Sequence, residues 1–578
     1  MARHQRRQAE PSVVGGMETL SLHVVVFVCG AVLMAFEMVG SRVLAPTFGS
    51  TIFVWGSLIG VFLGALSLGY LVGGRLADRA PKFLVLGAII AVAGLIILIV
   101  PLYAPACCRW IDRSGPARRL HPLLASVVLF FVPSVLLGMV SPFSVRLQAR
   151  TVATVGNVAG RLYALSTLGS IAGTVLATFW LVPSYGTSNI VRALGVSLIV
   201  VSLLAIVPRA LRGLSEGRVG GAAGAGGAVA AAVVLGLIPS PSFIPLDADE
   251  TLIAEVDSPY QHIGVVLRPW RYGGADEWSL QLKFDEYIES ELLVESGDPK
   301  DIHVRKPYTS GAKYTDTLHL PFLFNPDARR VLIVGGGGGI VPTIFARDYP
   351  QLERIHVVEI DPTVLDVAQR YFGFEPDGQR VTTAVMDGRV YLRDSKEQYD
   401  IVILDAFTGG RPPFHLLTSE CLENVKARLG PRGVVHLNII SSMEGEKSRL
   451  FWAMLKTFVH VFGRDHVYVF PKWFDPRWQT TSSPEYRRGI NIELVATNFE
   501  TTPSPLPKKQ IIDLADELVE RTRRIKVRSV VEHARNHQPL DELVPPEGKA
   551  VRTSFQESWE RAPLLTDDYA PVDNMVID

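Results

Sequence analysis

Long apolar runs dominate the first 240 residues of the chain. A helix needs about 20 apolar residues to cross a bilayer. Seven stretches reach that length, near residues 19–40, 52–74, 83–103, 122–142, 162–183, 188–207 and 222–240. The first is long for a cleaved signal peptide, and it runs into Glu37 and Arg42 without a small-residue cleavage site. The pattern therefore predicts a multi-pass membrane domain of about seven helices.

Beyond residue 245 the apolar runs become short. Pro239, Pro241 and Pro245 predict a linker, and residues 252–325 alternate apolar and polar positions as short strands do. From residue 326, strands alternate with helices, which is typical of a parallel sheet with helices on both faces. We expect strands at 331–335, 355–360, 381–385, 401–405, 433–439, 466–470 and 490–497, and helices near 340–348, 362–371, 416–428 and 446–460.

Polar and small residues inside the apolar spans carry separate predictions. Glu37 is the one acid well inside a span. It is either held in a structural ion pair, for which Arg42 is a partner, or it is a proton or cation site. Glycines four residues apart predict close helix packing in lipid. These pairs are Gly60 with Gly64, Gly69 with Gly73, and Gly169 with Gly173.

The basic residues give conflicting indications of topology. Arginines in segments 3–7 and 73–79 favour a cytoplasmic N-terminus. Seven spans then place the C-terminal half outside, which agrees with the arginines of 209–218. The arginines of 109–119 oppose that count, and nucleotide-derived cosubstrates are normally cytoplasmic. The sequence leaves open which side of the membrane the C-terminal half faces.

Charge is unevenly distributed, although the formal net charge is zero. The first 245 residues hold 18 Lys and Arg against 6 Asp and Glu, whereas the remainder holds 39 against 51. The second half thus has no excess of basic residues, which argues against nucleic acid as its partner. The four cysteines match neither a zinc spacing nor a disulfide framework, and we expect no metal.

Candidate ligand-binding residues follow four successive predicted strands. The strand at 331–335 runs into a glycine loop, the next ends at Glu359, and Asp387 and Asp405 follow the two after that. Parallel sheets bind ligands at this edge, and an acid after the second strand suits ribose hydroxyls. The loop contains Gly335, Gly336, Gly337, Gly338 and Gly339. The pattern predicts a nucleoside site. The alternatives are that Glu359 is only a surface acid and that Asp405 is only a helix cap or a loop residue.

At these residues the chain resembles the spermidine synthase (polyamine aminopropyltransferase) family, and more closely its membrane-fused, spermidine synthase-like bacterial relatives. The resemblance covers roughly residues 255–500 and includes the glycine loop and Glu359. Its other motifs are Tyr260-Gln261, the run Tyr314–Pro321 with Asp316, the pair Asp387-Gly388, and the catalytic loop from Asp405 through Thr408 to Pro412. The run Tyr314–Pro321 is one residue shorter than the family pattern.

The resemblance implies aminopropyl transfer. An amine attacks decarboxylated S-adenosylmethionine, methylthioadenosine leaves, and Asp405 accepts the proton. The implied cosubstrate residues are Gln261, Gly335, Gly336, Gly337, Gly338, Gly339, Glu359, Asp387 and Gly388. The implied acceptor residues are Tyr260, Tyr314, Asp316 and Thr408. The resemblance also implies a cell (inner) membrane location and a homodimer.

Departures from the family pattern remove negative charge at the acceptor end. Gly338 and Thr408 each stand where the family has an Asp, and Ser310 and Gly311 replace an Asp-Glu pair. A small dication such as putrescine would bind weakly there. We therefore expect a less charged small-molecule amine or a lipid-linked one as the acceptor, with membrane lipid as a further partner.

The resemblance also shapes the expected domain organisation. The fold class is a multi-pass α-helical membrane domain, then a small β-domain and an α/β Rossmann-like domain of methyltransferase type. We expect a cytoplasmic tail over 1–18, the membrane domain over 19–240 and a linker with the β-domain over 241–325. The nucleoside-binding catalytic domain covers 326–500, and a helical extension covers 501–578.

Two other functions stay open. A methyltransferase on the same fold would use S-adenosylmethionine and release S-adenosylhomocysteine. A membrane transporter or sensor would bind a nucleoside or polyamine without turnover; Gly338 and Thr408 favour it, whereas Asp405 opposes it. Asp567 and Asp568 near the C-terminus either return to the pocket and replace the missing acids, or belong to a cap or packed end.

Overall fold

The chain divides into two compact units, Met1–Phe243 and Ile244–Asp578. The computed structural model describes residues 16–49, 51–114, 118–149, 151–215, 238, 241–270, 277–305, 308–407, 412–471, 490–499, 506–522, 528–544, 553–568, 570, 572 and 575. Each unit has its own apolar core.

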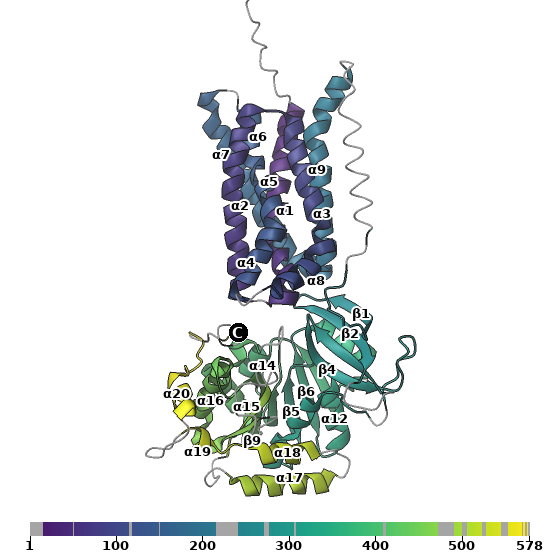
Figure 1. Ribbon diagram of the computed structural model, residues 1–578, viewed down its shortest axis with the longest axis vertical. Coiled ribbons are helices and arrows are strands. Elements are labelled where there is room, and N and C mark those ends of the chain that lie inside the picture. The colour runs from purple at the N-terminus through teal and green to yellow at the C-terminus, as the bar shows by residue number, and fades with distance from the viewer. Residues whose placement is uncertain are drawn as a thin grey trace, which may run out of the picture. The chain divides into compact units, whose positions relative to one another are not determined.

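The first unit is a bundle of long apolar helices (Figure 1). Six helical stretches of its described residues are long and apolar enough to cross a membrane: Gly16–Phe48, Ile52–Arg79, Phe83–Asp112, His121–Gln148, Thr154–Ser184 and Thr187–Ile206. They comprise α1 (Gly16–Phe48), α2 (Ile52–Arg79), α3 (Phe83–Asp112), α4 (His121–Ser126), α5 (Val132–Gly138), α6 (Val140–Gln148), α7 (Val152–Leu176), α8 (Val182–Ser184) and α9 (Thr187–Ser215). These helices account for the first six predicted spans, and the seventh, 222–240, lies outside the described residues.

Close packing in this unit depends on some of the predicted glycines. A Cβ atom on Gly169 or Gly173 would lie 2.0 Å from a backbone carbonyl oxygen of α1. Gly69 and Gly73 meet the chain around Val135–Met139 in the same way. Small residues thus let these helix backbones approach closely. For Gly60 and Gly64 no such packing is seen among the described residues, because a Cβ on either would meet none of their atoms within 4 Å.

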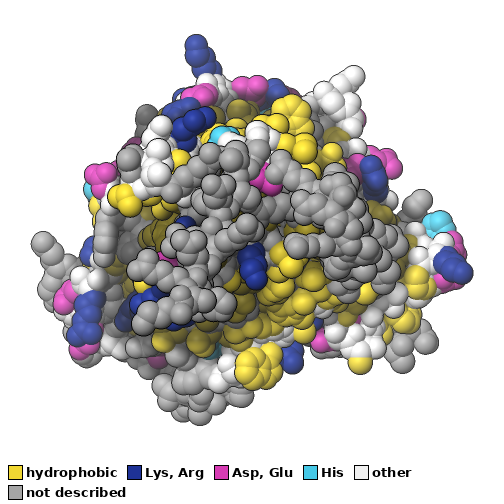
Figure 2. Space-filling model, turned by 90° about the horizontal axis from the view of Figure 1, so that it is seen from above, with side chains coloured by type: hydrophobic (Ala, Val, Ile, Leu, Met, Phe, Trp, Pro, Cys, Tyr) yellow, Lys and Arg dark blue, Asp and Glu magenta, His cyan; other side chains and the backbone are white. Residues whose placement is uncertain are grey.

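Many apolar side chains of the helical unit remain exposed. Leu63 and Leu71 of α2 and Leu168 and Phe179 of the fifth stretch are each more than half exposed. Hydrophobic side chains also form broad areas of the surface seen in Figure 2. Such exposure is expected where lipid replaces water as the surrounding solvent. Within α1, Arg42 is buried and Glu37 is half-buried, so both interpretations of Glu37 stay predictions.

The second unit begins with a small antiparallel sheet. Its strands lie in chain order: β1 (Thr251–Asp257), β2 (His262–Pro269), β3 (Trp278–Phe284) and β4 (Tyr287–Val294). Val265, Leu282 and Leu292 face the same apolar core as Val331 and Ile333 of the larger sheet. The two sheets therefore pack as one body, which holds the loops of the small sheet against the edge of the large one.

The larger sheet has seven strands in the order β10-β11-β9-β8-β5-β6-β7. They are β5 (Arg330–Val334), β6 (Arg354–Glu359), β7 (Val381–Val385), β8 (Tyr399–Leu404), β9 (Leu429–Ser441), β10 (Val467–Pro471) and β11 (Ile490–Thr497). The first five are parallel, whereas β11 is antiparallel to both β9 and β10. Consecutive connections run to opposite sides of β5, so the order reverses between β5 and β8, where α/β sheets bind ligands.

Helices cover both faces of this sheet (Figure 1). They are α12 (Ile340–Asp348), α13 (Pro362–Tyr371), α14 (Gly388–Asp394), α15 (Ser419–Arg428), α16 (Arg449–Phe462), α17 (Lys508–Thr522), α18 (Arg528–Asn536), α19 (Leu540–Leu543) and α20 (Thr553–Arg561), with the short helix α11 (Pro321–Phe324) and a 3-10 turn at Lys313–His319 before β5. The fold class predicted from the sequence is confirmed in these elements. The sequence pattern missed α14, because its seven residues are too few to show helical periodicity.

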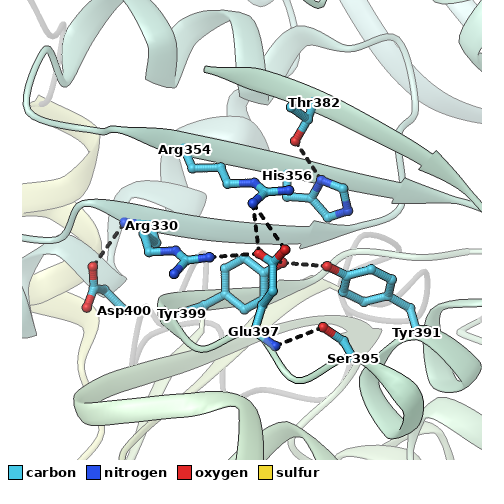
Figure 3. Close-up of polar contacts among 9 residues, drawn as sticks. All are labelled: Arg330, Arg354, His356, Thr382, Tyr391, Ser395, Glu397, Tyr399 and Asp400. Atoms are coloured by element: carbon cyan, nitrogen blue, oxygen red, sulfur yellow. Dashed lines mark hydrogen bonds and ion pairs between the residues drawn. The ribbon is translucent and has the colours of Figure 1, made fainter. Parts of the chain in front are cut away.

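An ionic cluster joins the amino ends of the parallel strands. Figure 3 shows Glu397 between Arg330 of β5 and Arg354 of β6, at 2.7 and 3.0 Å. Tyr399 of β8 donates a hydrogen bond to the same carboxylate, and Asp400 accepts from the backbone N–H of Arg330. The cluster lies at the opposite end of the strands from the predicted ligand site, so we assign it a structural role.

Replacing Glu397 by Gln is expected to destabilise the second unit modestly. The change leaves Arg330 and Arg354 without a shared counter-charge, but about a third of each side chain is exposed and solvent screens the loss. We expect a decrease of roughly 1 kcal/mol, or about 2–4 °C in Tm, with unchanged turnover. Asp366→Asn, which removes the exposed pair with Arg370, is the matched control and should change Tm less. Equal Tm shifts would contradict a structural role for the cluster.

Candidate functional site

A cavity of about 410 Å³ opens between the loops of the small sheet and the carboxyl edge of the large one. This volume lies in the range of small-molecule sites. The predicted residues that line it are Tyr260, Gln261, Tyr314, Gly335, Gly336, Gly337, Glu359, Asp387, Gly388 and Asp405. Residues that are more than 140 positions apart in the sequence are therefore brought to one site.

The glycine loop brings its backbone to this cavity at Gly335, Gly336 and Gly337. Gly335 has a φ of +108°, and a Cβ there would lie 2.3 Å from the carbonyl oxygen of Asp405. Only glycine suits this position, because both the conformation and the contact exclude a side chain. The N–H of Gly338 donates to Oγ of Ser290 at 2.9 Å, and α12 begins two residues later.

Glu359 ends β6 beside this loop. Its Oε2 accepts from the N–H of Gly336 at 2.7 Å, and its Oε1 accepts from the N–H of Asp361 at 2.9 Å. The side chain is almost fully buried, so the interpretation as a surface acid was wrong. Burial raises the pKa of Glu359, and the two backbone donors oppose that rise. Each oxygen keeps a further lone pair for a ligand hydroxyl.

Asp387 begins α14 and has two structural contacts. Its Oδ1 caps the helix by accepting from the N–H groups of Arg389 and Val390. Its Oδ2 lies 3.1 Å from Nε2 of His415, another residue that lines the cavity. No sequence pattern selects His415, since its loop follows a different strand from that of Asp387.

Asp405 follows β8, at the point where the strand order reverses. Its Oδ1 accepts a hydrogen bond of 3.0 Å from the amide of Asn438, which in turn accepts from Asn491. Asp405 caps no helix among the described residues. Burial raises the pKa of Asp405 to about 6, although the bond from Asn438 lowers it. Behind Asn438, His436 and Glu493 form a fully buried pair at 3.0 Å.

Glu289 is the acid that sequence reasoning missed. It lines the cavity from β4, and burial together with the nearby charge of Asp405 raises the pKa of Glu289 to about 8. Its carboxylate has no hydrogen-bond partner in the described part of the chain, whereas Tyr314 donates to its backbone carbonyl at 2.8 Å. The only signal in the sequence is a pair of acids, Glu289 and Glu291, in one otherwise apolar strand. The pattern does not distinguish them, whereas in the structure Glu291 accepts hydrogen bonds from Ser279 and Gln281.

Other predicted residues lie elsewhere. Gly338, Gly339 and Asp316 are described but do not line the cavity, and Thr408 lies outside the described residues. A Cβ on Gly339 would lie 2.3 Å from the ring of Phe374, so this glycine serves packing.

The C-terminal acids do not replace the missing charges. Asp567 forms an ion pair with Arg389 and accepts from Thr418 at 2.8 Å, and neither it nor Asp568 lines the cavity. Asp567 therefore secures the C-terminal segment against α14 and α15. The interpretation of these residues as a packed chain end agrees with the structure.

Comparison with known proteins gives consistent matches. The family profile of the spermine/spermidine synthase domain matches residues 312–471. A polyamine aminopropyltransferase of Vibrio vulnificus (strain CMCP6) is 38% identical over 226 residues, which cover 38% of this chain and 69% of the relative.

A second relative and a solved structure extend this comparison. Polyamine aminopropyltransferase 2 of Ralstonia nicotianae is 27% identical over 397 residues, covering 66% of this chain and 70% of the relative. That coverage exceeds the share of residues 244–578, so the match reaches into the helical unit. A probable spermidine synthase from Corynebacterium glutamicum is 23% identical, with a TM-score of 0.35 and coverage of 46% of this chain and 86% of that one.

Proposed function

The chain belongs to the polyamine aminopropyltransferase family, and from that premise we propose that it transfers an aminopropyl group from decarboxylated S-adenosylmethionine to an amine, releasing methylthioadenosine. One observation carries the proposal: Asp405, the glycine loop and Glu359 line one cavity at the reversal point of the sheet. A base and a nucleoside-binding edge thus meet where the reacting atoms would lie.

The adenosine part of the cosubstrate is assigned to the edge formed by β5, β6 and β7. Glu359 would accept hydrogen bonds from the ribose hydroxyls, and the Asp387–His415 pair would face the base. Gly335, Gly336, Gly337 and Gly388 allow close approach, and Gln261 faces them from the small sheet. The polar groups match a nucleoside, which supports this assignment.

The reaction is a displacement at carbon. The lone pair of a neutral amine forms a bond to the methylene carbon next to the sulfonium, the carbon–sulfur bond breaks, and its electron pair neutralises the sulfur. The substituted amine then loses a proton, for which the Asp405 carboxylate is the acceptor. Asn438 holds that carboxylate in a fixed orientation.

The acceptor side combines one acid with aromatic rings. Glu289, Tyr260 and Tyr314 line the cavity around Asp405. A carboxylate and aromatic faces both attract an ammonium group before it is deprotonated. Glu289 thus supplies an acidic group that the glycine and threonine of the family positions lack, and an ammonium group beside it would favour its ionised form. The six apolar helices support a multi-pass location in the cell membrane.

The decisive experiment measures the nucleoside product. The full chain in lipid nanodiscs is supplied with decarboxylated S-adenosylmethionine and a set of primary amines and diamines, and methylthioadenosine is quantified. We expect its release to depend on an amine and on Asp405. Release of S-adenosylhomocysteine from S-adenosylmethionine instead would indicate a methyltransferase, and release of neither product would favour the transporter or sensor.

A further inference from the structure

The mouth of the cavity is unusually apolar. In the described part of the second unit, ten large hydrophobic side chains are exposed. Eight of them belong to the mouth, and we call them the apolar rim: Tyr260, Tyr287, Ile288, Ile360, Val385, Met386, Phe414 and Ile440. Five line the cavity while remaining exposed, Met386 and Phe414 lie next to lining residues in the chain, and Val385 lies two positions before Asp387, which lines it. Exposed apolar side chains are common singly, but their collection around one opening indicates a binding surface.

The rim combines residues from both sheets. Tyr260 lies in the turn before β2 and Tyr287 and Ile288 begin β4, whereas Ile360 and Ile440 lie at the carboxyl edge of the large sheet. The amino edge of the same sheet carries Arg330, Arg354 and Glu397 instead (Figure 3). The contrast shows that the apolar surface is confined to the cavity end of the sheet.

The interior beyond the rim is suited to a cation. Asp405 and Glu289 face the same space, and the carboxylate of Glu289 lacks a hydrogen-bond partner among the described residues. The two acids can bracket one ammonium group, whereas the exposed rim side chains beyond them are apolar. A second ammonium on the same substrate would have to lie against apolar side chains, which costs its hydration.

We propose that the amine acceptor is amphiphilic, with one ammonium group held by Asp405 and Glu289 and an apolar chain lying on the rim. This proposal rests on the proposed function and specifies its substrate class. The chain's own apolar helices are consistent with such a substrate, because amphiphilic amines partition into lipid.

The test compares amines that differ in one feature. Methylthioadenosine release is measured in nanodiscs with n-butylamine, n-hexylamine and n-octylamine, and with 1,8-diaminooctane, which has the length of octylamine but a second charge. We expect kcat/KM to rise by about two- to fourfold per added methylene. Octylamine should exceed 1,8-diaminooctane by at least about tenfold.

Variants separate binding at the rim from concentration in the lipid. The double variant Ile288→Ser/Phe414→Ser should flatten the dependence on chain length and leave butylamine within about threefold. Leu246→Ser is the matched control, because Leu246 is exposed but does not line the cavity. It should keep the full dependence, since partitioning into the nanodisc is the same for both variants.

Four outcomes would overturn the proposal. A flat dependence on chain length, or a diamine that equals octylamine, would remove the amphiphilic acceptor while leaving aminopropyl transfer intact. Equal losses for short and long amines in the rim variant would assign the rim to another partner, such as a second copy of the chain. Absence of methylthioadenosine with every amine and diamine would overturn the proposed function, and this proposal with it.

Discussion

Asp405→Asn is expected to lower kcat by about 10²- to 10⁴-fold, the range typical of a lost general base. Asparagine has the same shape, and its carbonyl oxygen can still accept from Asn438, which donates to Asp405 at 3.0 Å. The cavity should therefore keep its geometry. What disappears is the group that takes the proton from the attacking amine, so the chemical step slows while cosubstrate binding persists.

The pH dependence of the unmodified protein provides a second readout of the same residue. Burial raises the pKa of Asp405 to about 6, and only the deprotonated carboxylate can accept a proton. kcat/KM should thus decrease as the pH falls through about 6. In Asp405→Asn the residual activity should lack this limb, because the titrating group is gone.

Single-turnover release of methylthioadenosine measures the step directly, and equilibrium binding of methylthioadenosine provides the control. An Asn variant within threefold of the unmodified protein would exclude Asp405 as the base. An Asn variant that also loses methylthioadenosine binding would instead indicate a collapsed site. In that case Asn438→Ser, which removes the hydrogen bond to the Asp405 carboxylate, would show whether a lost orientation of this side chain explains the loss of activity.

Glu359→Gln is expected to raise the KM for decarboxylated S-adenosylmethionine by about 10- to 100-fold, with a much smaller change in kcat. Charge-assisted hydrogen bonds contribute about 1.5–3 kcal/mol each. Glutamine loses the charge and also turns an amide N–H towards one of two backbone donors, at Gly336 and Asp361. The loss falls on binding, because Glu359 lies at the ribose end and not at the reacting carbon.

Steady-state kinetics at varied cosubstrate concentration distinguish these effects, with Tm as the check on folding. Glu353→Gln is a suitable control, since Glu353 pairs with Arg329 at the exposed amino edge. A large fall in kcat with an unchanged KM would move Glu359 from cosubstrate binding to the chemical step and contradict the assignment.

The sequence predicted the strands and the carboxyl-edge residues well, because glycines and acids after apolar strands carry a local signal. Gly335, Glu359, Asp387 and Asp405 needed only their own neighbours in the chain to be selected. Glu289, His415 and Asn438 gave no such signal. Each is an ordinary polar residue in a strand or loop, and only the pairing of the two sheets brings it to the cavity.

The errors have an equally physical origin. Gly60 and Gly64 show the spacing of packed glycines, but spacing does not specify which face of α2 meets another helix. Asp567 and Asp568 carry the charge that the acceptor end lacks, yet Arg389 supplies a partner for Asp567 at a different position. For the glycine pair and for the C-terminal acids alike, the sequence contains the motif, but the tertiary structure determines which residues it contacts.

Along the long strand β9, the residues on the cavity side become more exposed towards its carboxyl end. Asn438 and Ile440 lie on the same face of the strand and both line the cavity, but Asn438 is buried and Ile440 is exposed. His436, two positions earlier on that face, is fully buried with Glu493. On the proposed assignments, the residue that orients the base and a residue that selects the amine lie two positions apart on one rigid strand. Substitution at the outer position would then change which amines enter without disturbing the proton acceptor.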